Sequence, residues 1–286
     1  MELGVGIIGF GFMGRAHTYG LINIPLFYNE PPFRIRHIDA CRRSAEGRAE
    51  AEALGYFRRV VEDYRELIDD PEIDVICVST PNVFHKEHLL AALRAGKHIY
   101  CDKPVVTSLE EAEEVAQAIE ECNYRGKAQV AFHNRFFPAI MRARQLIDEE
   151  FLGRVFHYRG AYLHASNIDP NRPISWKSRK ETGGGGSLVD LGVHLIDMMC
   201  YLLGDMTRVF ATCATLIPER PDPQTGAPTP VDTDDLALLI VRHASGALGT
   251  LEATKFATGT CDELRFEIHG AHGALRFNLM DPNRLE

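Results

Sequence analysis

A glycine-rich loop placed directly after an apolar strand is the feature that most constrains the fold of this chain. Residues 5–9 have the composition of a buried strand, and the residues after them open a helix. The loop has the spacing Gly-x-Gly-x-x-Gly and consists of Gly9, Phe10, Gly11, Phe12, Met13 and Gly14. Between a strand and a helix, this spacing lets the backbone approach a pyrophosphate at the helix N-terminus. It predicts a dinucleotide-binding βαβ unit.

Strand and helix patterns alternate through the first half of the chain. Strands are expected at 34–41, 75–79, 97–101 and 128–132, and helices at 45–54, 85–95 and 108–122. Ser108 is the expected N-cap of the last helix, with Glu111 at the capping-box distance. This α/β alternation predicts a Rossmann domain with a doubly wound parallel sheet over residues 1–132.

The second half has a different pattern. A helix is expected at 138–150, followed by strands at 154–164, 207–217, 234–243, 246–256 and 262–269. One further helix is expected at 188–203, and the proline-rich residues 218–233 are expected to form a long loop. Residues 133–286 are therefore predicted to form an α+β domain with a mainly antiparallel open sheet.

Composition and charge exclude several classes of protein. The 286 residues carry a net charge of −9 with no basic tract, which argues against a nucleic-acid or anionic-membrane partner. The N-terminus has no signal-peptide pattern, and no run approaches a membrane span of about 20 apolar residues. The seven cysteines show no pairing pattern and are expected to be reduced core thiols of a cytoplasmic protein. His269 and His272 lack a second ligand pair, so no metal site is expected.

The end of the strand at 34–41 bears on the choice of cofactor. An acidic residue there forms a hydrogen bond with the ribose hydroxyl of NAD, whereas arginine accommodates the 2′-phosphate of NADP. If the strand ends at Cys41, then Cys41, Arg42, Arg43 and Ser44 are the expected contacts, and the arginines would bind the phosphate. If it ends earlier, Asp39 would bind the ribose and the cofactor would be NAD. Of these two alternatives we favour the first, and therefore NADP.

A lysine follows the strand at 97–101. Ligands of an open parallel sheet bind outside the carboxyl ends of its strands, so Lys103 is expected beside a bound cofactor. Pro104 restricts the backbone of this lysine. The loop after strand 75–79 lies at the same edge of the sheet, and its expected cofactor contacts are Ser79, Thr80, Pro81 and Asn82.

A third group of polar residues lies in the second half. Four glycines at 183–186 precede the helix at 188–203, in which Asp190 and His194 are four residues apart and share a face. A carboxylate there can orient an imidazole, the side chain best suited to acid–base chemistry near neutral pH. An ordinary salt bridge has the same spacing. The glycine run favours a site, because it allows close approach to the backbone.

In their order along the chain, these motifs resemble the Gfo/Idh/MocA oxidoreductase family, which includes inositol and glucose–fructose dehydrogenases. The motifs are the glycine loop with Arg15, Ala16 and His17; Ser79–Asn82 with His85; Ala95–His98; Asp102–Pro104; His133–Phe136 with Pro138; Trp176 with Lys177; and Asp190–His194. The resemblance implies that Lys103, Asp190 and His194 match the family's catalytic lysine, aspartate and histidine. It places Asp102 and His85 with the cofactor contacts and Asn134, Arg135 and Trp176 near the substrate.

The resemblance implies an NAD(P)-dependent dehydrogenase that acts on CH–OH groups of a sugar-like or cyclitol substrate. His194 would take the hydroxyl proton, Lys103 would stabilise the alkoxide and Asp190 would orient the pair. Two alternatives are an NAD-dependent glycosidase of the same fold and a non-catalytic nucleotide-binding regulator.

The chain departs from the family pattern in two respects. Asp102 stands where the family usually has glutamate, and the second domain is expected to be C-terminally short for the family. A homodimer or homotetramer is expected, because residues 236–241 are apolar at almost every position and a partner would bury them.

Overall fold

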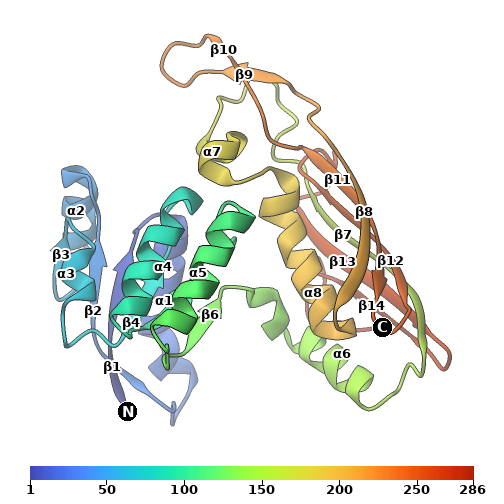
Figure 1. Cartoon of the computed structure of the whole chain (residues 1–286), viewed down its shortest axis with the longest axis horizontal. Coiled ribbons are helices and arrows are strands. Elements are labelled where there is room, and N and C mark those ends of the chain that lie inside the picture. Colours follow the sequence, from blue (N-terminus) through green and yellow to red (C-terminus); the bar gives the residue numbers. More distant parts are fainter. The chain divides into compact units, whose positions relative to one another are not determined.

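The computed structural model describes residues 1–286 and divides them into two compact units, Met1–Ala131 and Phe132–Glu286. The first unit contains a six-stranded parallel sheet with the order β3-β2-β1-β4-β5-β6 (Figure 1). Its strands are β1 Glu2–Ile8, β2 Arg34–Cys41, β3 Val60–Val61, β4 Val75–Val78, β5 His98–Cys101 and β6 Ala128–Val130. This is the predicted Rossmann sheet, and its strand order reverses between β1 and β4, where ligands of this fold bind.

The helices of the first unit alternate with its strands as predicted. They are α1 Phe12–Phe27, α2 Ala45–Glu52, α3 Arg65–Ile68, α4 His85–Arg94 and α5 Leu109–Glu121, with the 3-10 turn η1 Asn82–Phe84 before α4. The short elements β3 and α3 were not predicted. At the start of α5, Ser108 accepts from the Glu111 amide at 3.2 Å, whereas the Glu111 carboxylate accepts from the Thr107 amide at 2.9 Å. The Glu111 carboxylate thus accepts from the amide of Thr107, whereas in a standard capping box it accepts from the amide of the N-cap residue.

The second unit contains a six-stranded sheet with the order β14-β13-β7-β12-β11-β8. Its strands are β7 Val155–His164, β8 Met206–Ala214, β11 Leu236–His243, β12 Leu248–Thr254, β13 Asp262–Gly270 and β14 Ala274–Asn278. Only β7 and β12 pair in parallel, so the prediction of a mainly antiparallel sheet is confirmed. Helices α6 Pro138–Asp148 and α8 Val193–Leu203 lie on one face of this sheet (Figure 1).

Two expectations were wrong. Residues 218–233 include a hairpin, β9 Glu219–Pro221 with β10 Pro228–Pro230, held by buried Arg220, whose guanidinium donates to the Asn167 carbonyl at 2.6 Å. These strands were not predicted because proline residues lie at their ends, and proline is unusual in paired strands. Not all cysteines are core thiols, because Cys122, Cys213 and Cys261 are exposed, although all seven are free.

The helix expected at 188–203 is present, with Gly204 as its C-cap. It begins with a π-helical turn, η4 Leu188–Gly192, and only then continues as α8. The stretch Lys180–Leu203, which also includes the short helix α7 Lys180–Gly183, is long and apolar enough to cross a membrane, but half of its apolar window is buried. A helix in a protein core meets the same criteria, so the stretch is weak evidence for a membrane span.

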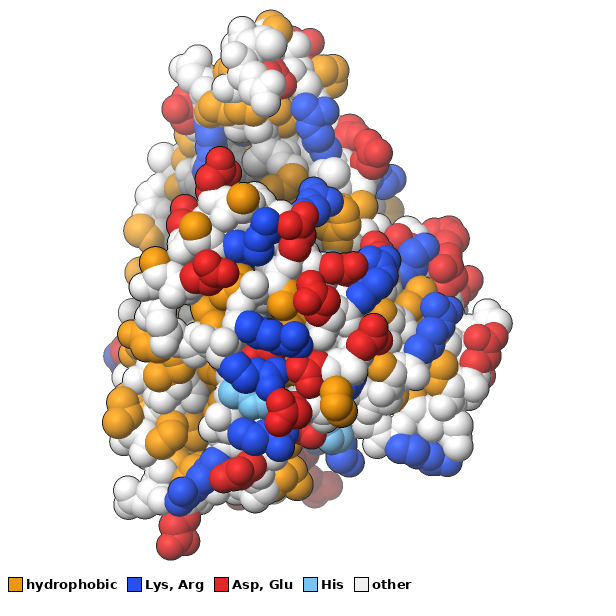
Figure 2. All heavy atoms as spheres, turned by 90° about the vertical axis from the view of Figure 1, so that its left-hand side faces the viewer, with side chains coloured by type: hydrophobic (Ala, Val, Ile, Leu, Met, Phe, Trp, Pro, Cys, Tyr) orange, Lys and Arg blue, Asp and Glu red, His pale blue; other side chains and the backbone are white.

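The charged face in Figure 2 shows Lys and Arg side chains intermixed with Asp and Glu, without the continuous basic stripe that nucleic-acid binding uses.

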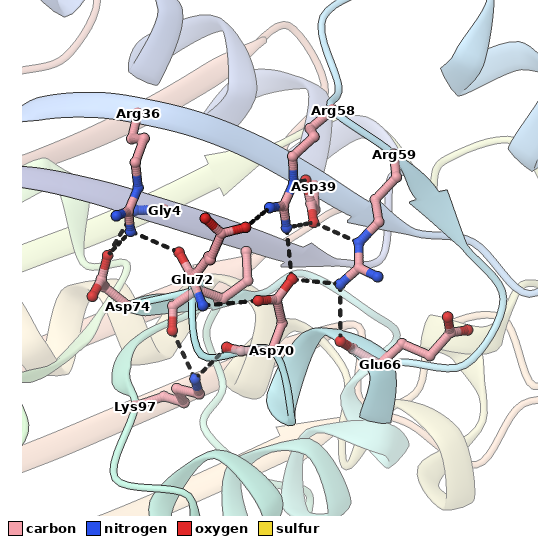
Figure 3. Close-up of polar contacts among 11 residues, drawn as sticks. Gly4, Arg36, Asp39, Arg58, Arg59, Glu66, Asp70, Glu72, Asp74 and Lys97 are labelled. Carbon is pink, nitrogen blue, oxygen red and sulfur yellow. Dashed lines mark hydrogen bonds and ion pairs between the residues drawn. The ribbon is translucent and has the colours of Figure 1, made fainter.

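A buried carboxylate stabilises the edge of the first sheet. Asp39 on β2 is fully buried and accepts from Arg58 Nε at 3.0 Å and from Arg59 Nε at 2.9 Å (Figure 3). Both guanidinium groups also donate to Asp70, at 2.6 and 2.7 Å. Burial by itself raises the pKa of Asp39, but the hydrogen bonds and charges of the two arginines outweigh burial and lower this pKa below its ordinary value.

This network predicts a pH-dependent contribution to stability. Asp39→Asn should lower the free energy of unfolding at pH 7 by about 2–3 kcal/mol, less than for a fully buried pair because the arginines are partly exposed. Since the folded-state pKa is lowered, this contribution is present above the unfolded pKa of about 3.9 and is lost as pH falls through the folded pKa. Urea unfolding at pH 7 and pH 3 measures it. The control Glu50→Gln, whose side chain is 62% exposed, should change stability little. An equal loss at both pH values would contradict the prediction.

Candidate active site

The three glycines of the first loop each meet a different steric condition. Gly9 has φ +92°, and a Cβ there would lie 2.7 Å from the Ser79 carbonyl oxygen. A Cβ on Gly14 would lie 2.3 Å from the Gly9 carbonyl oxygen, so α1 packs on the loop only with glycine there. A Cβ on Gly11 would meet no atom within 4 Å, which leaves its backbone open to a ligand. These conditions fit a bound dinucleotide. Phe10 is buried in this loop, whereas Phe12 is 85% exposed and Met13 is half-buried.

The second strand ends at Cys41, so the residues after it occupy the position that contacts the adenosine ribose. Asp39 is not available for this role, because both of its oxygens accept from Arg58 and Arg59. The strand end thus corresponds to the alternative in which residues 41–44 follow the strand. Cys41 donates to the Glu62 carbonyl at 3.3 Å, and burial raises its pKa to about 12.

Arg42, Arg43 and Ser44 lie together at the start of α2. Ser44 caps the helix by accepting from the Gly47 amide at 3.2 Å. The Arg43 guanidinium lies 5.6 Å from the centre of the Phe84 ring, which brings it to the turn after β4. The side chain of Arg42 lies against Gly47, where an added Cβ would be 2.4 Å from Arg42 Nε. Both arginines thus belong to the segment between the end of β2 and the start of α2.

The loop after β4 is tied to the glycine loop and to the segment that carries Lys103. Ser79 Oγ donates to the Gly9 carbonyl at 2.7 Å. His85 is fully buried, and its ring nitrogens lie 2.9 Å from the Thr80 carbonyl oxygen and 2.8 Å from that of Pro104. His85 therefore positions two loops rather than facing solvent. Pro81 is exposed and Asn82 is buried beside it.

Asp102 has a specific partner that the sequence analysis missed. Its Oδ1 lies 2.8 Å from Nε2 of His17 on α1, and both side chains are largely buried. The contact joins the end of β5 to the helix that follows the glycine loop. The shorter side chain of aspartate therefore still makes a polar contact next to Lys103. The signal was in the sequence, because His17 lies three residues after the last glycine of the loop.

In the second unit, Trp176 and Asp190 line one cavity of about 380 Å³. Asp190 lies in the π-helical turn, and its carboxylate is 3.0 Å from Lys177 Nζ and 2.9 Å from Lys255 Nζ. Neither lysine was among the predicted site residues. Trp176 is 37% exposed, and Lys177 Nζ lies 5.6 Å from the centre of its ring. The cavity thus presents an aromatic ring beside a carboxylate and two cations.

His194 is buried among aromatic rings. The ring centres of Phe132, His133 and Tyr162 lie 5.9, 5.4 and 5.8 Å from that of His194. Burial raises the pKa of Tyr162 most strongly, and the charges of Asp262 and Asp190 raise it further. Tyr162 is thus in ring contact with His194 and in the electrostatic field of Asp190.

The other two predicted substrate residues have different environments. Asn134 is 3% exposed, and its amide nitrogen has no hydrogen-bond partner. A buried amide donor without a partner is costly, which is compatible with a ligand acceptor. Arg135 instead donates to Asp197 on α8 through both Nε, at 2.7 Å, and a terminal nitrogen. The structure therefore places Arg135 in an ion pair.

The last glycine of the run before this turn, Gly186, is explained by a segment of the chain itself. A Cβ on Gly186 would lie 1.8 Å from the Asp234 carbonyl oxygen. The Asp234 carboxylate accepts from the Gly186 amide at 3.0 Å and from the Leu188 amide at 2.7 Å. Close approach was expected from the glycines, and the approaching group is Asp234. No group of three or more His, Cys, Asp or Glu side chains among residues 1–286 is placed to hold a metal ion.

Comparison with known proteins identifies the family of both units. Residues 3–130 match the model of an oxidoreductase family with an NAD-binding Rossmann fold, and residues 140–276 match the GFO/IDH/MocA C-terminal domain. Levoglucosan dehydrogenase of Pseudarthrobacter phenanthrenivorans is 39% identical, over 97% of this chain and 74% of the relative. Myo-inositol 2-dehydrogenase of Thermotoga maritima is 28% identical, over 95% of this chain and 74% of the relative.

Solved structures agree with this assignment. A levoglucosan dehydrogenase in complex with NADH and levoglucosan superposes with a TM-score of 0.94 at 39% identity, covering 100% of this chain and 75% of that one. An NAD-binding oxidoreductase from Klebsiella pneumoniae gives a TM-score of 0.93 at 34% identity, covering 100% and 75% of the two chains. The chain is a member of the Gfo/Idh/MocA family of oxidoreductases, which bind NAD through a Rossmann fold.

Proposed function

We propose that this oxidoreductase is an NAD(P)-dependent dehydrogenase that oxidises a CH–OH group of a sugar-like or cyclitol substrate. The observation that carries the proposal is the cavity in the second unit, which both Trp176 and Asp190 line. Its volume of about 380 Å³ suits a small ligand, and its polar lining suits hydroxyl groups. Relatives named for levoglucosan, inositol and xylose support the same substrate class.

The site residues divide into cofactor, substrate and catalytic roles. Bound NAD or NADP supplies the hydride acceptor. The backbone at Gly11 is open to a pyrophosphate. Substrate contacts are assigned to Asn134, whose amide nitrogen has no hydrogen-bond partner, and to Trp176, which lines the cavity. His194 takes the hydroxyl proton, the Lys103 ammonium stabilises the alkoxide as its charge develops, and Asp190 orients the reacting groups.

The assignment of the base and the cation predicts the behaviour of two variants. His194→Ala should lower kcat by about 10²–10⁴-fold, the range for loss of general acid–base catalysis, with little change in NADH affinity. Lys103→Met keeps the length but loses the charge, so it should be similarly severe. Nicotinamide absorbance during turnover of polyols, sugars and cyclitols measures both. Near-wild-type turnover in either variant would remove that residue from the mechanism. Glycoside cleavage without NAD(P)H accumulation would instead select a glycosidase.

We also propose that the enzyme prefers NADP, because Arg42, Arg43 and the capped start of α2 follow the strand end. Arg42→Asp should weaken NADP binding by at least about tenfold more than NAD binding, because it places a carboxylate opposite the phosphate. Fluorescence titration with both cofactors checks this. Arg125→Asp, which makes the same charge change on an exposed loop of the first unit, is the control. Equal weakening of both cofactors by Arg42→Asp would overturn the NADP preference.

We further propose a homodimer or homotetramer formed through the outer face of the second sheet. Phe210 on β8 pairs with Ile240 on β11, and their side chains are 69% and 55% exposed. Leu238 on the same strand as Ile240 is 41% exposed. Apolar side chains grouped in this way on a sheet face are typical of an interface.

Charged substitutions on this face should separate the subunits. The double variant Phe210→Lys/Ile240→Lys should sediment as a monomer, because buried unpaired ammonium groups oppose association. Leu109→Lys, at an exposed position on α5, should leave the sedimentation coefficient unchanged. A wild-type protein that sediments as a folded monomer at high concentration would contradict this proposal.

A further inference from the structure

Lys255 is a buried cation next to the carboxylate to which the mechanism assigns an orienting role. It follows β12 directly, and its side chain is only 9% exposed. Its ammonium lies 2.9 Å from Oδ2 of Asp190, whose side chain is 18% exposed. Lysine is almost never buried without a partner, so the position of Lys255 depends on Asp190. Both charges are largely withdrawn from water.

The backbone of Lys255 is held on both sides. Its amide donates to the Asp235 carbonyl at 3.2 Å, and its carbonyl accepts from the Asn167 amide at 3.1 Å. The preceding Thr254 Oγ1 also donates to the Asp235 carbonyl, at 2.9 Å. The backbone of Lys255 is therefore held in place by neighbouring segments. Because the Cα of the side chain is fixed, the ammonium group at its end has less freedom to move.

Lys177 contacts the same carboxylate from a different kind of position. Its ammonium lies 3.0 and 3.1 Å from the two oxygens of Asp190, but its side chain is 46% exposed. It lies in a short 3-10 turn, η3 Trp176–Ser178. An exposed lysine contributes little to an ion pair and readily exchanges it for water. The two cations of Asp190 are therefore not equivalent.

The remaining charged groups that line the cavity have partners of their own. His164 pairs with Asp262 at 2.9 Å, and both Asp234 and Asp235 accept from backbone amides. Arg172 donates to the Ser166 carbonyl. Arg220, which also lines the cavity, donates to backbone carbonyls. Of the cations that line the cavity, the two lysines are those with an ion pair to Asp190.

We propose that Lys255 is a positioning residue for the dehydrogenase reaction: it keeps Asp190 ionised and in one orientation, whereas Lys177 is an exchangeable partner that a substrate hydroxyl replaces. This inference rests on the proposed function, because it assumes that Asp190 acts in turnover. It adds Lys255, a residue that makes no direct contribution to the reacting bond.

The pH dependence of turnover distinguishes a positioning role from a structural one. Lys255→Met should lower kcat about tenfold or more and move the acidic limb of the kcat/KM profile to higher pH by about 1–2 units, because an Asp190 carboxylate that Lys255 no longer neutralises stabilises the charged form of His194 more strongly. Lys255→Arg keeps the positive charge, so its acidic limb should lie close to that of the wild type. Lys177→Met is the matched control, and it should move the limb much less. Asp190→Asn should move the limb to lower pH, because His194 then lacks a carboxylate that stabilises its charged form.

The same shift in Lys177→Met as in Lys255→Met, or an unmoved limb in Lys255→Met, would overturn the proposal. A second measurement does not need activity. The carboxyl carbon of Asp190, observed by NMR in protein labelled with 13C-aspartate and assigned by its loss in Asp190→Asn, should titrate at higher pH in Lys255→Met than in the wild type. If the wild type oxidises no polyol, sugar or cyclitol with either cofactor, the proposed function fails. The NMR titration then still decides whether Lys255 keeps Asp190 ionised.

Discussion

The cavity of the second unit depends on the hydrogen bonds of two consecutive aspartates, Asp234 and Asp235. Buried amides must find acceptors, and the start of a helix offers several amides that the helix itself cannot satisfy. Asp234 accepts from the amides of Gly186 and Leu188, and the Asp235 carbonyl accepts from Ser187 Oγ at 2.8 Å. The same carbonyl accepts from the Lys255 amide. One short segment thus positions the turn that carries Asp190 and the strand end that carries Lys255.

This arrangement explains the last glycine before the π-helical turn. A side chain at 186 would collide with the Asp234 backbone, so glycine is required at this position for packing within the second unit. Glycine loses much conformational entropy on folding, and the hydrogen bonds to Asp234 and Asp235 offset this cost. A turn held this tightly can place Asp190 between two ammonium groups. The preorganisation of the site is therefore a property of the backbone contacts behind it.

In the first unit the same principle acts through steric contacts. Gly9 and Gly14 let three segments pack against one another, and Ser79 then donates to the Gly9 carbonyl. The loops that carry Ser79 and Lys103 are joined by buried His85. A ligand at the edge of the sheet would therefore meet a backbone that is already in place. Such preorganisation lowers the cost of binding a cofactor.

Much of the architecture could be predicted from local pattern. Central parallel strands such as β4 are apolar throughout, and the loop before α1 has a spacing that few other folds use, so the Rossmann sheet was predicted with nearly correct strands. The hairpin at 219–230 was missed, because its strands are short and contain proline. Its stability comes from Arg220 and the carbonyls it contacts, which lie about 50 residues away in the chain.

The sequence by itself determined the order of strands and helices, the glycine loop, and the residue types available for chemistry, because these depend on local periodicity and short spacings. Tertiary structure decided which of those residues meet. Asp39 carries the charge expected of a ribose-binding acid, yet two arginines some twenty residues away bind it. Asp190 is four residues from His194 in the sequence, and the fold also brings Lys177 and Lys255 into ion pairs with it. Partners so distant in sequence are brought together only by sheet pairing and burial, which local pattern does not encode.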